Sequence, residues 1–421
     1  MTLRLYYTDP SLQAFDAVVV GVERRDDRLL VTLDRTAFYP TSGGQPFDTG
    51  TLGGLRVIDV IDADDASIAH VLNLEPGTWN VEQWNPGVAV HGLVDWPRRL
   101  DHMQQHTGQH VLSAAFDRLF GVRTVSFHLG AAVSTIDLAR ELTPVEIAAG
   151  ETEANRIVWE DRPVGVRFAT AEEAAQLPLR KESGREGTLR LIDVDGFDLS
   201  ACGGTHVART GAIGVIAVAS WERFKGGQRI EFLCGGRALG RFRALRDTVS
   251  ATVRLLSVLP EALPASIERL QTEAKEQKRS LVALQNELAR FRAGELAASA
   301  EPVWLPVPRR GEGKPDTGRA CDRRLVLRAL DADANGLKAL ASAIVAKPGY
   351  LVVLVSTTRP ALVVVARSSD VPAAAQQIVA SLTAAFGGRG GGKPELAQGG
   401  GLDAAADAIL DAARAAIVGD S

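Results

Sequence analysis

Cysteine, methionine and aromatic residues are scarce in this sequence, and charge of neither sign is in large excess. Its 421 residues include two methionines, and aromatic side chains make up 5%. The three cysteines, Cys202, Cys234 and Cys321, are too few and too scattered for a disulfide framework, so a reducing, cytoplasmic location is expected. With 47 Lys and Arg against 51 Asp and Glu, a nucleic-acid partner must bind at a local basic patch rather than in a global positive field.

Long apolar runs are also absent. No window approaches about 18 uninterrupted apolar residues, and the stretch from Met1 to Asp9 carries a charge and lacks a small-residue cleavage site. We therefore expect neither a membrane span nor an export signal. A hydrophobic share of 46% fits a globular protein of two or three domains.

The first half of the chain changes from strand-like to mixed patterns. Residues 1–94 contain short alternating runs broken by Gly, Pro and Asp, which predict a small β-barrel subdomain. Residues 95–240 mix helical and strand patterns and predict an α+β domain. Its clearest helix covers 98–120 and stops at Gly121. A second helix starts at the capping box Thr143–Glu146 and runs to about Trp159.

The second half predicts a long helical segment followed by another mixed domain. Residues 241–321 form a helical or coiled-coil linker, because apolar or small residues between 264 and 298 recur at 4-3-4-3 spacing. Two interpretations stay open here, a helical hairpin that joins two domains and a dimer seam. After a polar stretch at 306–318, residues 322–421 predict an α/β domain, which makes the whole chain α+β.

Three of the seven histidines lie close together on the helix predicted over 98–120. His102, His106 and His110 are spaced four residues apart, so their imidazoles share one face of that helix. Side chains at this spacing have Cβ atoms about 5–6 Å apart, close enough for two rings to bind one metal ion at about 2.0–2.1 Å. This face is therefore a candidate half of a metal site.

A thiol and an imidazole four residues apart offer the other half. Cys202 and His206 flank two glycines, which let the chain wrap tightly enough to present both side chains to one ion. Together with His106 and His110 they form a set of three nitrogens and one sulfur. Such a set suits one Zn²⁺ ion rather than Mg²⁺ or Ca²⁺.

This motif differs from that of the zinc peptidases. In those enzymes a glutamate follows the first histidine as general base, whereas Thr107 follows His106 here. Four protein ligands also close a tetrahedral site. Either the ion becomes five-coordinate with substrate or water, or it positions a ligand rather than ionising water.

Two glycine-rich segments complete the set of motifs. The first, Asp34–Gly50, is either a turn within the barrel or a loop in which hydroxyls and the Gln45 amide read a small polar substrate. The second, Gly387–Gly401, is no P-loop, because Pro394 follows its lysine. It is either a flexible linker or a basic loop whose backbone N–H groups approach phosphate.

In their order along the chain, these motifs resemble the freestanding alanyl-tRNA editing proteins, the AlaX family, in its long form. The segments His106–His110 and Cys202–His206 are similar to the zinc motifs of that family and of the alanyl-tRNA synthetase editing domain. Thr36–Gln45 is similar to the glycine-rich motif that faces the editing pocket, and Gly387–Gly401 resembles the end of the DHHA1 domain. The resemblance covers nearly the whole chain.

The resemblance implies a zinc-dependent hydrolase that removes serine, with glycine as a second candidate, from mischarged tRNA(Ala). It implies that Thr36 recognises the serine hydroxyl and that His102 and His128 line the pocket together with Gln45. Contact with tRNA is implied for five residues of the second glycine-rich segment, namely Gly388, Arg389, Gly390, Lys393 and Gln398.

The sequence also departs from related patterns. No ATP-binding segment of a class II synthetase fits before Leu3, so editing in trans without aminoacylation is the expectation. Synthetase editing domains carry a glutamine after the zinc helix, and residues 121–128 contain none. Asp101 and His102 are followed by Met103, so the Asp-His-His cluster of DHH phosphoesterases is missing.

Two alternative functions remain open at this point. The closed set of four ligands also fits a tRNA-binding module in which zinc is purely structural. A zinc hydrolase that acts on an ester outside RNA, with a linker-like C-terminus, is the other alternative. A homodimer through the helical linker or the C-terminal domain is a further expectation.

Overall fold

The computed structural model describes residues 1–25, 27–74, 84–180, 187–303 and 323–418. They form two compact units, Met1–Leu255 and Leu256–Ser421. Both combine helices with strands, which confirms the α+β class, whereas the three boundaries between the four predicted domains stay predictions. The polar stretch at 306–318 and Cys321 lie outside the described residues. No helix within these ranges is long and apolar enough to cross a membrane.

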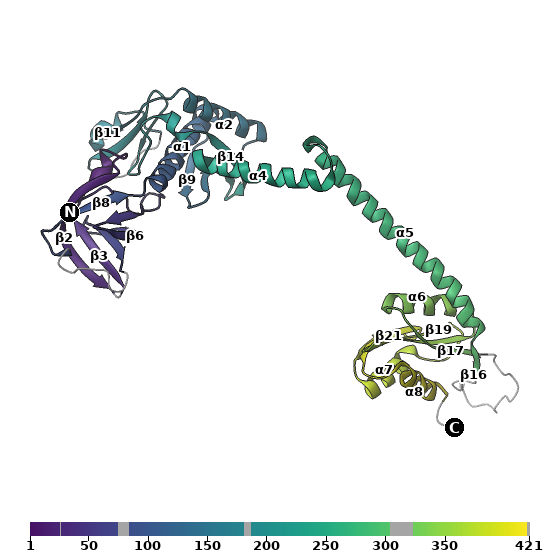
Figure 1. Cartoon of the computed structure of the whole chain (residues 1–421). Helices are drawn as coiled ribbons and strands as arrows, with labels where there is room; N and C mark the ends of the chain where they lie inside the picture. The colour runs from purple at the N-terminus through teal and green to yellow at the C-terminus, as the bar shows by residue number, and fades with distance from the viewer. Residues whose placement is uncertain (26, 75–83, 181–186, 304–322, 419–421) are drawn as a thin grey trace. The chain divides into compact units, whose positions relative to one another are not determined.

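The first unit begins with a closed barrel, which confirms the predicted β-barrel (Figure 1). Alternate residues of its first strand, Phe15, Ala17 and Val19, are buried in the barrel core. Around the barrel the strands are β2 (Ala14–Arg25), β3 (Arg28–Leu33), β7 (Ile68–Asn73), β6 (Leu55–Asp62), β5 (Gly50–Leu52) and β8 (Ala89–Val94). Beside it, β1 (Leu3–Arg4) pairs in parallel with β4 (Arg35–Thr36), and a 3-10 helix covers Leu5–Tyr7.

The helix α1 (Trp96–Phe120) carries the histidine motif. Its start lies two residues before the predicted position, because the Asp95 side chain caps it by accepting a hydrogen bond from Arg98 N–H. Gly121, in the left-handed conformation, ends it as predicted. Every residue from Gln105 to Phe116 is buried, so the rest of the unit surrounds the helix on all sides.

Two antiparallel sheets pack around α1. One has the order β14-β15-β10-β9 and the other β11-β12-β13. The predicted capping box is confirmed at α2, where Thr143 and Glu146 exchange hydrogen bonds. These strands are β9 (Thr124–Leu129), β10 (Ser134–Leu138), β11 (Val164–Ala169), β12 (Leu189–Val194), β13 (Asp198–Ala201), β14 (Ile216–Phe224) and β15 (Gly227–Cys234). The helices are α2 (Pro144–Trp159), α3 (Ala171–Ala175), a 3-10 helix (Thr210–Ile213) and α4 (Gly235–Leu256).

A buried ion pair joins the first glycine-rich segment to α1. Arg99 and Asp48 have fully buried side chains, and Arg99 Nε lies 3.0 Å from both carboxylate oxygens. Asp48 also accepts a hydrogen bond from Tyr39 N–H at 2.7 Å, and Arg99 donates to the carbonyl of Pro10 at 2.8 Å. Because a buried charge is stable only when it is paired and hydrogen-bonded, this arrangement holds the segment in one place against the helix.

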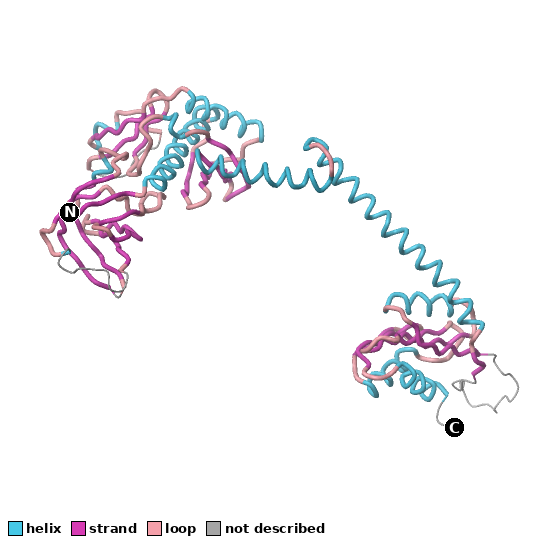
Figure 2. The backbone as a smooth tube through the Cα atoms, viewed as in Figure 1, coloured by secondary structure: helices cyan, strands magenta, loops and turns pink. Residues whose placement is uncertain are grey.

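The second unit is a six-stranded sheet with helices on both faces (Figure 2). α6 (Ala334–Val345) packs on one face, and α7 (Ala375–Phe386) and α8 (Ala406–Val418) pack on the other. The predicted long helix is confirmed as α5 (Leu263–Ala298), which follows a 3-10 helix (Pro260–Ala262) and packs on α6. In sheet order, the strands are β16 (Glu301–Val303), β17 (Arg323–Leu330), β18 (Tyr350–Ser356), β19 (Ala361–Arg367), β21 (Leu396–Leu402) and β20 (Arg389–Gly392).

The sequence analysis interpreted the second glycine-rich segment as either a linker or a loop, and both interpretations are wrong. The segment forms the antiparallel strands β20 and β21 at one edge of this sheet. The missing side chains let α7 lie close to these strands, since a Cβ atom on Gly390 would lie 2.6 Å from Val379 Cγ1. A Cβ atom on Gly399 would meet the same side chain at 3.2 Å. The glycines therefore serve close packing of a helix on a sheet.

Replacing Gly390 should separate this packing effect from the general effect of adding a side chain. Gly390→Ala places a methyl group against Val379 and 2.9 Å from the carbonyl oxygen of Gln398, and overpacking of this kind lowers the free energy of unfolding by about 1–3 kcal/mol. Gly391→Ala, one position along, meets nothing within 4 Å and should leave stability unchanged. Urea unfolding of both variants measures the difference, and equal losses would contradict the packing argument.

Candidate metal centre

Four side chains from two distant segments meet at one point in the first unit. His106 and His110 come from α1, and Cys202 and His206 come from the loop after β13. Their ligand atoms all lie within 4.8 Å of one another. Cys202 Sγ lies 3.3 Å from Nε2 of His106 and 3.4 Å from Nε2 of His206. This group could hold a metal ion, and all three imidazoles are buried.

Glycine at position 204 makes the meeting of the two segments feasible. A Cβ atom there would lie 2.1 Å from Cε1 of His106 and 2.3 Å from its Nδ1. No side chain can be placed at such distances, so only glycine lets the loop reach the helix. Arg190 holds the same loop by donating to the carbonyls of Cys202 at 2.8 Å and Gly204 at 2.9 Å.

The Nδ1 atom of each imidazole forms a hydrogen bond with a side-chain oxygen of another residue. The partners are Gln45 Oε1 for His106 at 2.9 Å, Asp198 Oδ2 for His110 at 3.0 Å and Thr107 Oγ1 for His206 at 3.3 Å. Such partners orient a histidine and leave its Nε2 free to bind a metal.

The directions of these bonds follow from the oxygen atoms. Gln45 Oε1 also accepts from Thr205 N–H at 3.1 Å, so it is an acceptor, and Nδ1 of His106 must donate. The Thr107 hydroxyl donates to the carbonyl of Met103 at 2.8 Å and therefore accepts from His206. The carboxylate of Asp198 can only accept. All three imidazoles thus carry their proton on the side away from Cys202.

Electrostatics favour a thiolate at the centre. Burial opposes ionisation of Cys202, but His106 and His206 outweigh it and lower the pKa of this thiol well below its usual value. The thiolate is the form that binds metal. Burial likewise opposes charge on His110 and Asp198, yet their mutual hydrogen bond raises the pKa of His110 and lowers that of Asp198.

Gln45 and Thr36 are both engaged within the protein. Gln45 is fully buried behind His106, and its Nε2 donates to Thr205 Oγ1 at 2.8 Å. Its amide therefore positions a ligand candidate rather than facing open space. Thr36 lies buried in the barrel, where its hydroxyl is 2.7 Å from Nε2 of His70. Because Nδ1 of His70 donates to the carbonyl of Val31 at 2.9 Å, its Nε2 accepts the Thr36 proton.

His102 and His128 are not part of the four-residue cluster. His102 is 3% exposed, one helical turn before His106, and its Nδ1 has no hydrogen-bond partner within the described ranges. Burial, together with Arg98, lowers the pKa of His102 to about 4. His128 is exposed on β9, whereas the preceding residue, Phe127, has its ring 5.9 Å from that of His106.

Sequence reasoning missed Thr107, Asp198 and Phe127. The sequence analysis used Thr107 only to distinguish this motif from that of the zinc peptidases. A hydroxyl next to a ligand candidate is nevertheless a suitable hydrogen-bond partner for an imidazole. Asp198 lies four residues before Cys202, and this short spacing was the available signal. Nothing local in the sequence marks Phe127.

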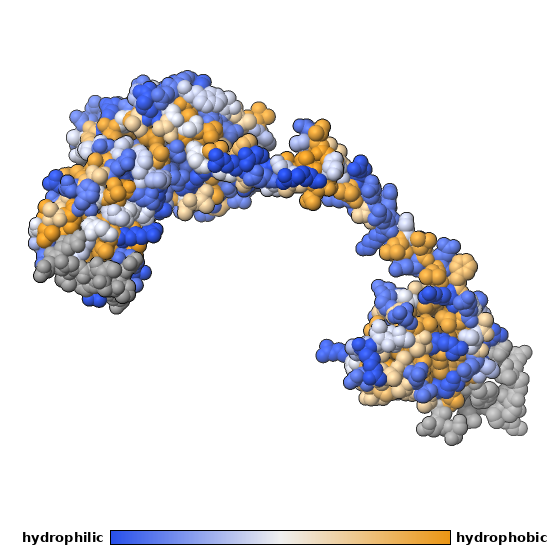
Figure 3. Space-filling model, viewed as in Figure 1, coloured by the Kyte–Doolittle hydropathy of each residue, from blue (hydrophilic) through white to orange (hydrophobic). Residues whose placement is uncertain are grey.

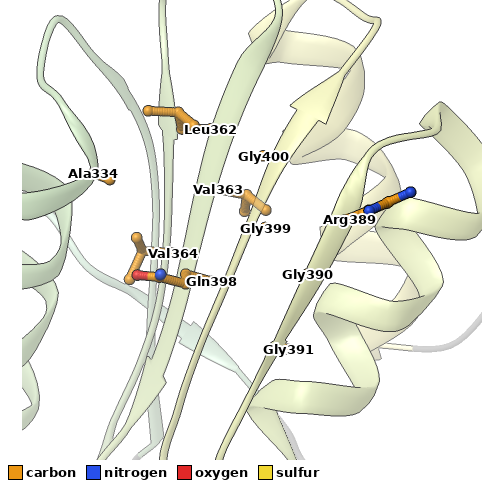
Figure 4. Close-up of a pocket in the computed structure, with 10 residues that line it drawn as sticks. All are labelled: Ala334, Leu362, Val363, Val364, Arg389, Gly390, Gly391, Gln398, Gly399 and Gly400. Atoms are coloured by element: carbon orange, nitrogen blue, oxygen red, sulfur yellow. The ribbon is translucent and has the colours of Figure 1, made fainter. Parts of the chain in front are cut away.

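The C-terminal unit has a pocket beside its glycine-rich strands (Figure 4). The pocket measures about 450 Å³ and lies on the face of the sheet that carries α6. Arg389, Gly390 and Gln398 are among its lining residues, and Gln398 pairs with Val364 across the sheet. Gly388 lies just before β20, and Lys393 is exposed in the turn between the two strands.

Two family models match this chain, one in each unit. Residues 189–231 match the threonyl and alanyl tRNA synthetase second additional domain, and residues 322–419 match the DHHA1 domain. The chain is 30% identical to alanyl-tRNA editing protein AlaX-L of Pyrococcus horikoshii, and the match covers 98% of each chain. The chain belongs to the AlaX-L family. The resemblance found in the sequence is confirmed.

Alanine–tRNA ligases match this chain as well. Alanine–tRNA ligase of Pyrococcus furiosus is 33% identical over 94% of this chain, and that of Methanothrix thermoacetophila is 35% identical over 99%. This AlaX-L family member spans 42% and 45% of the two ligases, less than half of each. A crystal structure of the C-Ala domain from Aquifex aeolicus alanyl-tRNA synthetase covers 24% of the chain, with 20% identity and a TM-score of 0.22.

Loss of the Gln45 amide should weaken metal binding in this AlaX-L family member. Gln45→Ala frees the ring of His106, and loss of such an orienting partner typically lowers metal affinity about 10–100-fold. Gln105→Ala is the matched control, because Gln105 is also a buried glutamine but bonds to the backbone of Cys234. Competition with a chromophoric chelator measures both affinities. Equal affinity of Gln45→Ala and the unsubstituted protein would contradict the positioning argument.

Proposed function

We propose that this protein is a zinc-dependent editing hydrolase that cleaves the ester bond of mischarged tRNA(Ala). The main substrate is Ser-tRNA(Ala), with Gly-tRNA(Ala) as the second. The observation that carries the proposal is the cluster of His106, His110, Cys202 and His206, in a chain that belongs to the AlaX-L family. Three nitrogens and one thiolate are a donor set that zinc prefers, which supports one Zn²⁺ per chain.

Hydrolytic editing is needed because binding alone cannot separate alanine from serine and glycine well enough. A pocket that accepts alanine cannot strongly reject the smaller glycine, or a serine that only adds a hydroxyl group. A second, hydrolytic site that accepts these amino acids removes the errors that the first site cannot exclude.

In this proposal, the protein side chains orient the centre and the substrate. A zinc ion bound there would supply a Lewis acid for the aminoacyl end of the tRNA. Gln45, Asp198 and Thr107 keep the three imidazoles in place, and Arg190 keeps the Cys202 loop in place. Because these groups are already hydrogen-bonded, they need no reorganisation when the substrate binds.

Three residues outside the cluster are assigned roles in substrate handling. Thr36 donates a hydrogen bond to His70 and accepts one from Phe38 N–H at 3.1 Å, so one lone pair of its oxygen remains to accept a hydrogen bond from a serine hydroxyl. His102 is neutral at pH 7, and its Nδ1 has no hydrogen-bond partner among the described residues, so it can hold or move a proton during ester cleavage. His128 is assigned to the pocket rim, where its exposure permits contact with RNA.

The C-terminal unit is assigned to tRNA binding. Arg389 and Lys393 lie on exposed glycine-rich strands and their turn, where few side chains separate the backbone from a ligand. Gly388, Gly390 and Gln398 complete the proposed contact surface, which includes the pocket beside β20 and β21. Phosphate contacts of this kind position a nucleic acid without reading its bases.

One observation favours a second candidate function. The cluster has four protein ligands, and a closed tetrahedral site is typical of structural zinc. The protein would then be a tRNA-binding module without hydrolytic activity. The two functions differ in whether the ester bond is cleaved.

Deacylation assays with the full chain test the leading proposal. The zinc-loaded protein should release serine and glycine from tRNA(Ala) and spare alanine, and Cys202→Ala or a chelator should abolish the release. Cys234→Ala is the matched control, because Cys234 is the other cysteine among the described residues and lies outside the cluster. Binding of tRNA without ester cleavage by the zinc-loaded protein would contradict the hydrolase and support the binding module.

The role of His102 has its own test. His102→Gln should lower kcat about 10²–10⁴-fold, the range for loss of a proton-transfer group, while zinc content and KM stay unchanged. His91→Gln, at an exposed position of β8, is the control. Unchanged kcat in His102→Gln would remove His102 from the proposed machinery.

A further inference from the structure

The helix α4 carries an excess of positive charge that sets it apart from the rest of the chain. Its 22 residues contain one acidic side chain, Asp247, whereas the chain as a whole has a net charge of −4. Figure 3 shows strongly hydrophilic residues at several points along this helix, which Figure 1 labels. The basic residues of α4 are Arg237, Arg241, Arg243, Arg246 and Arg254. Arginines gathered along one helix are the electrostatic footprint of a phosphate-binding surface.

The charge of α4 is not neutralised among the described residues. Its one carboxylate, Asp247, pairs with Arg246 at 2.8 Å. Arg241 and Arg243 are exposed, and neither makes a hydrogen bond or an ion pair with any described residue. By contrast, Arg156 on α2 lies 2.7 Å from a glutamate carboxylate. The guanidinium groups of Arg241 and Arg243 are therefore available to a ligand outside the chain.

The first turn of α4 is fixed beside the elements that border the candidate metal centre. Arg237 Nη2 lies 2.6 Å from Asp101 Oδ2 on α1, and Arg237 Nη1 donates to the carbonyl of Gly130 at 2.8 Å. Gly130 directly follows β9, whose Phe127 has its ring 5.9 Å from that of His106. The basic helix thus begins next to the cluster of ligand candidates.

Beyond this turn, α4 lies open to solvent. Every residue from 239 to 251 is exposed. At a rise of about 1.5 Å per residue, the helix extends over about 33 Å. Its arginines therefore form a row that starts beside the candidate metal centre and continues along an exposed helix.

Arg241 and Arg243 flank a part of the helix surface that has no large side chain. Gly240 and Ala244 lie between them, because residues three or four positions apart are neighbours on a helix. A Cβ atom on Gly240 would meet no described atom within 4 Å, so this glycine is not needed for internal packing. The large apolar side chains of this stretch lie on the opposite side of the helix, namely Phe242, Leu245 and Val249. A phosphate backbone can thus approach α4 closely between two guanidinium groups.

We propose that α4 binds the phosphate backbone of the tRNA acceptor stem, whose 3′ end enters the candidate metal centre. The ester bond lies at that 3′ end, so the stem must leave the centre along a neighbouring surface, and α4 is an exposed basic surface in that place. Guanidinium groups bind phosphate oxygens through paired hydrogen bonds, and such contacts position an RNA helix without reading its sequence.

The inference rests on the proposed function, because it takes tRNA(Ala) as the ligand. It adds to that function a surface of the first unit, with Arg241 and Arg243 as the residues that contact the stem.

Binding of an RNA hairpin to the full zinc-loaded chain tests the proposal. The hairpin reproduces the acceptor stem of tRNA(Ala) with an uncharged CCA end, so the rest of the tRNA contributes no contacts. Arg241→Gln combined with Arg243→Gln should weaken binding and lower the slope of log Kd against log salt by about two, about one for each lost phosphate contact. Fluorescence anisotropy over a series of salt concentrations measures both quantities.

Two control variants separate the charge of α4 from net charge and from folding. Arg156→Gln combined with Arg167→Gln removes the same charge from exposed arginines that have carboxylate partners, and the salt slope should stay unchanged. Arg241→Lys combined with Arg243→Lys keeps the charge on α4 and should retain the slope of the unsubstituted protein. Circular dichroism of each variant checks that the helices are retained.

Deacylation of Ser-tRNA(Ala) distinguishes this inference from the proposed function. Loss of both arginines should raise KM, because these side chains hold the stem away from the ester bond. A protein that binds the hairpin through Arg241 and Arg243 but cleaves no ester would support the role of α4 and contradict the hydrolase. Ester cleavage by the unsubstituted protein, with Kd, salt slope and KM unchanged in the glutamine variant, would overturn the role of α4. Failure of the unsubstituted protein to bind the hairpin would overturn it as well.

Discussion

The amide of Gln45 connects the three segments on which the metal centre depends. It comes from the glycine-rich segment of the barrel, accepts a hydrogen bond from His106 on α1 and makes two hydrogen bonds with Thr205 beside His206. The buried pair of Arg99 and Asp48 holds the same segment against α1. The glycine-rich segment of the barrel thus orients the candidate metal ligands. Burial makes this constraint strong, because each buried polar group that lost its partner would remain desolvated.

Burial also explains why the four ligand candidates belong together. Three imidazoles and the negatively charged thiolate of Cys202 lie together in a part of the fold that water hardly reaches. A divalent cation would compensate that charge and accept the Nε2 lone pairs that the Nδ1 hydrogen bonds leave available. The hydrogen bonds of His106, His110 and His206 therefore prepare one side of each ring for the protein and the other for an ion.

Close packing in the second unit depends on residues with small side chains or none. Glycines in β20 and β21 let α7 approach the sheet closely, and the opposite face keeps a pocket beside exposed basic residues. The helix α5 likewise has two faces, one with buried alanines that pack on α6 and one with exposed apolar side chains such as Leu284 and Phe291. In both places glycine or alanine allows the close internal contact, and larger or charged groups remain at the surface.

Local patterns in the sequence determined much of this protein. Alternation, helix caps and heptad spacing predicted the barrel, α1, α2 and α5, because each rests on residues a few positions apart. The same is true of the pairs His106–His110 and Cys202–His206. Only the tertiary structure decided which oxygens hold the imidazoles, since these partners lie 61, 88 and 99 residues away. It also decided that a glycine-rich run forms strands, because glycine carries no side-chain pattern and its conformation is set by what packs against it.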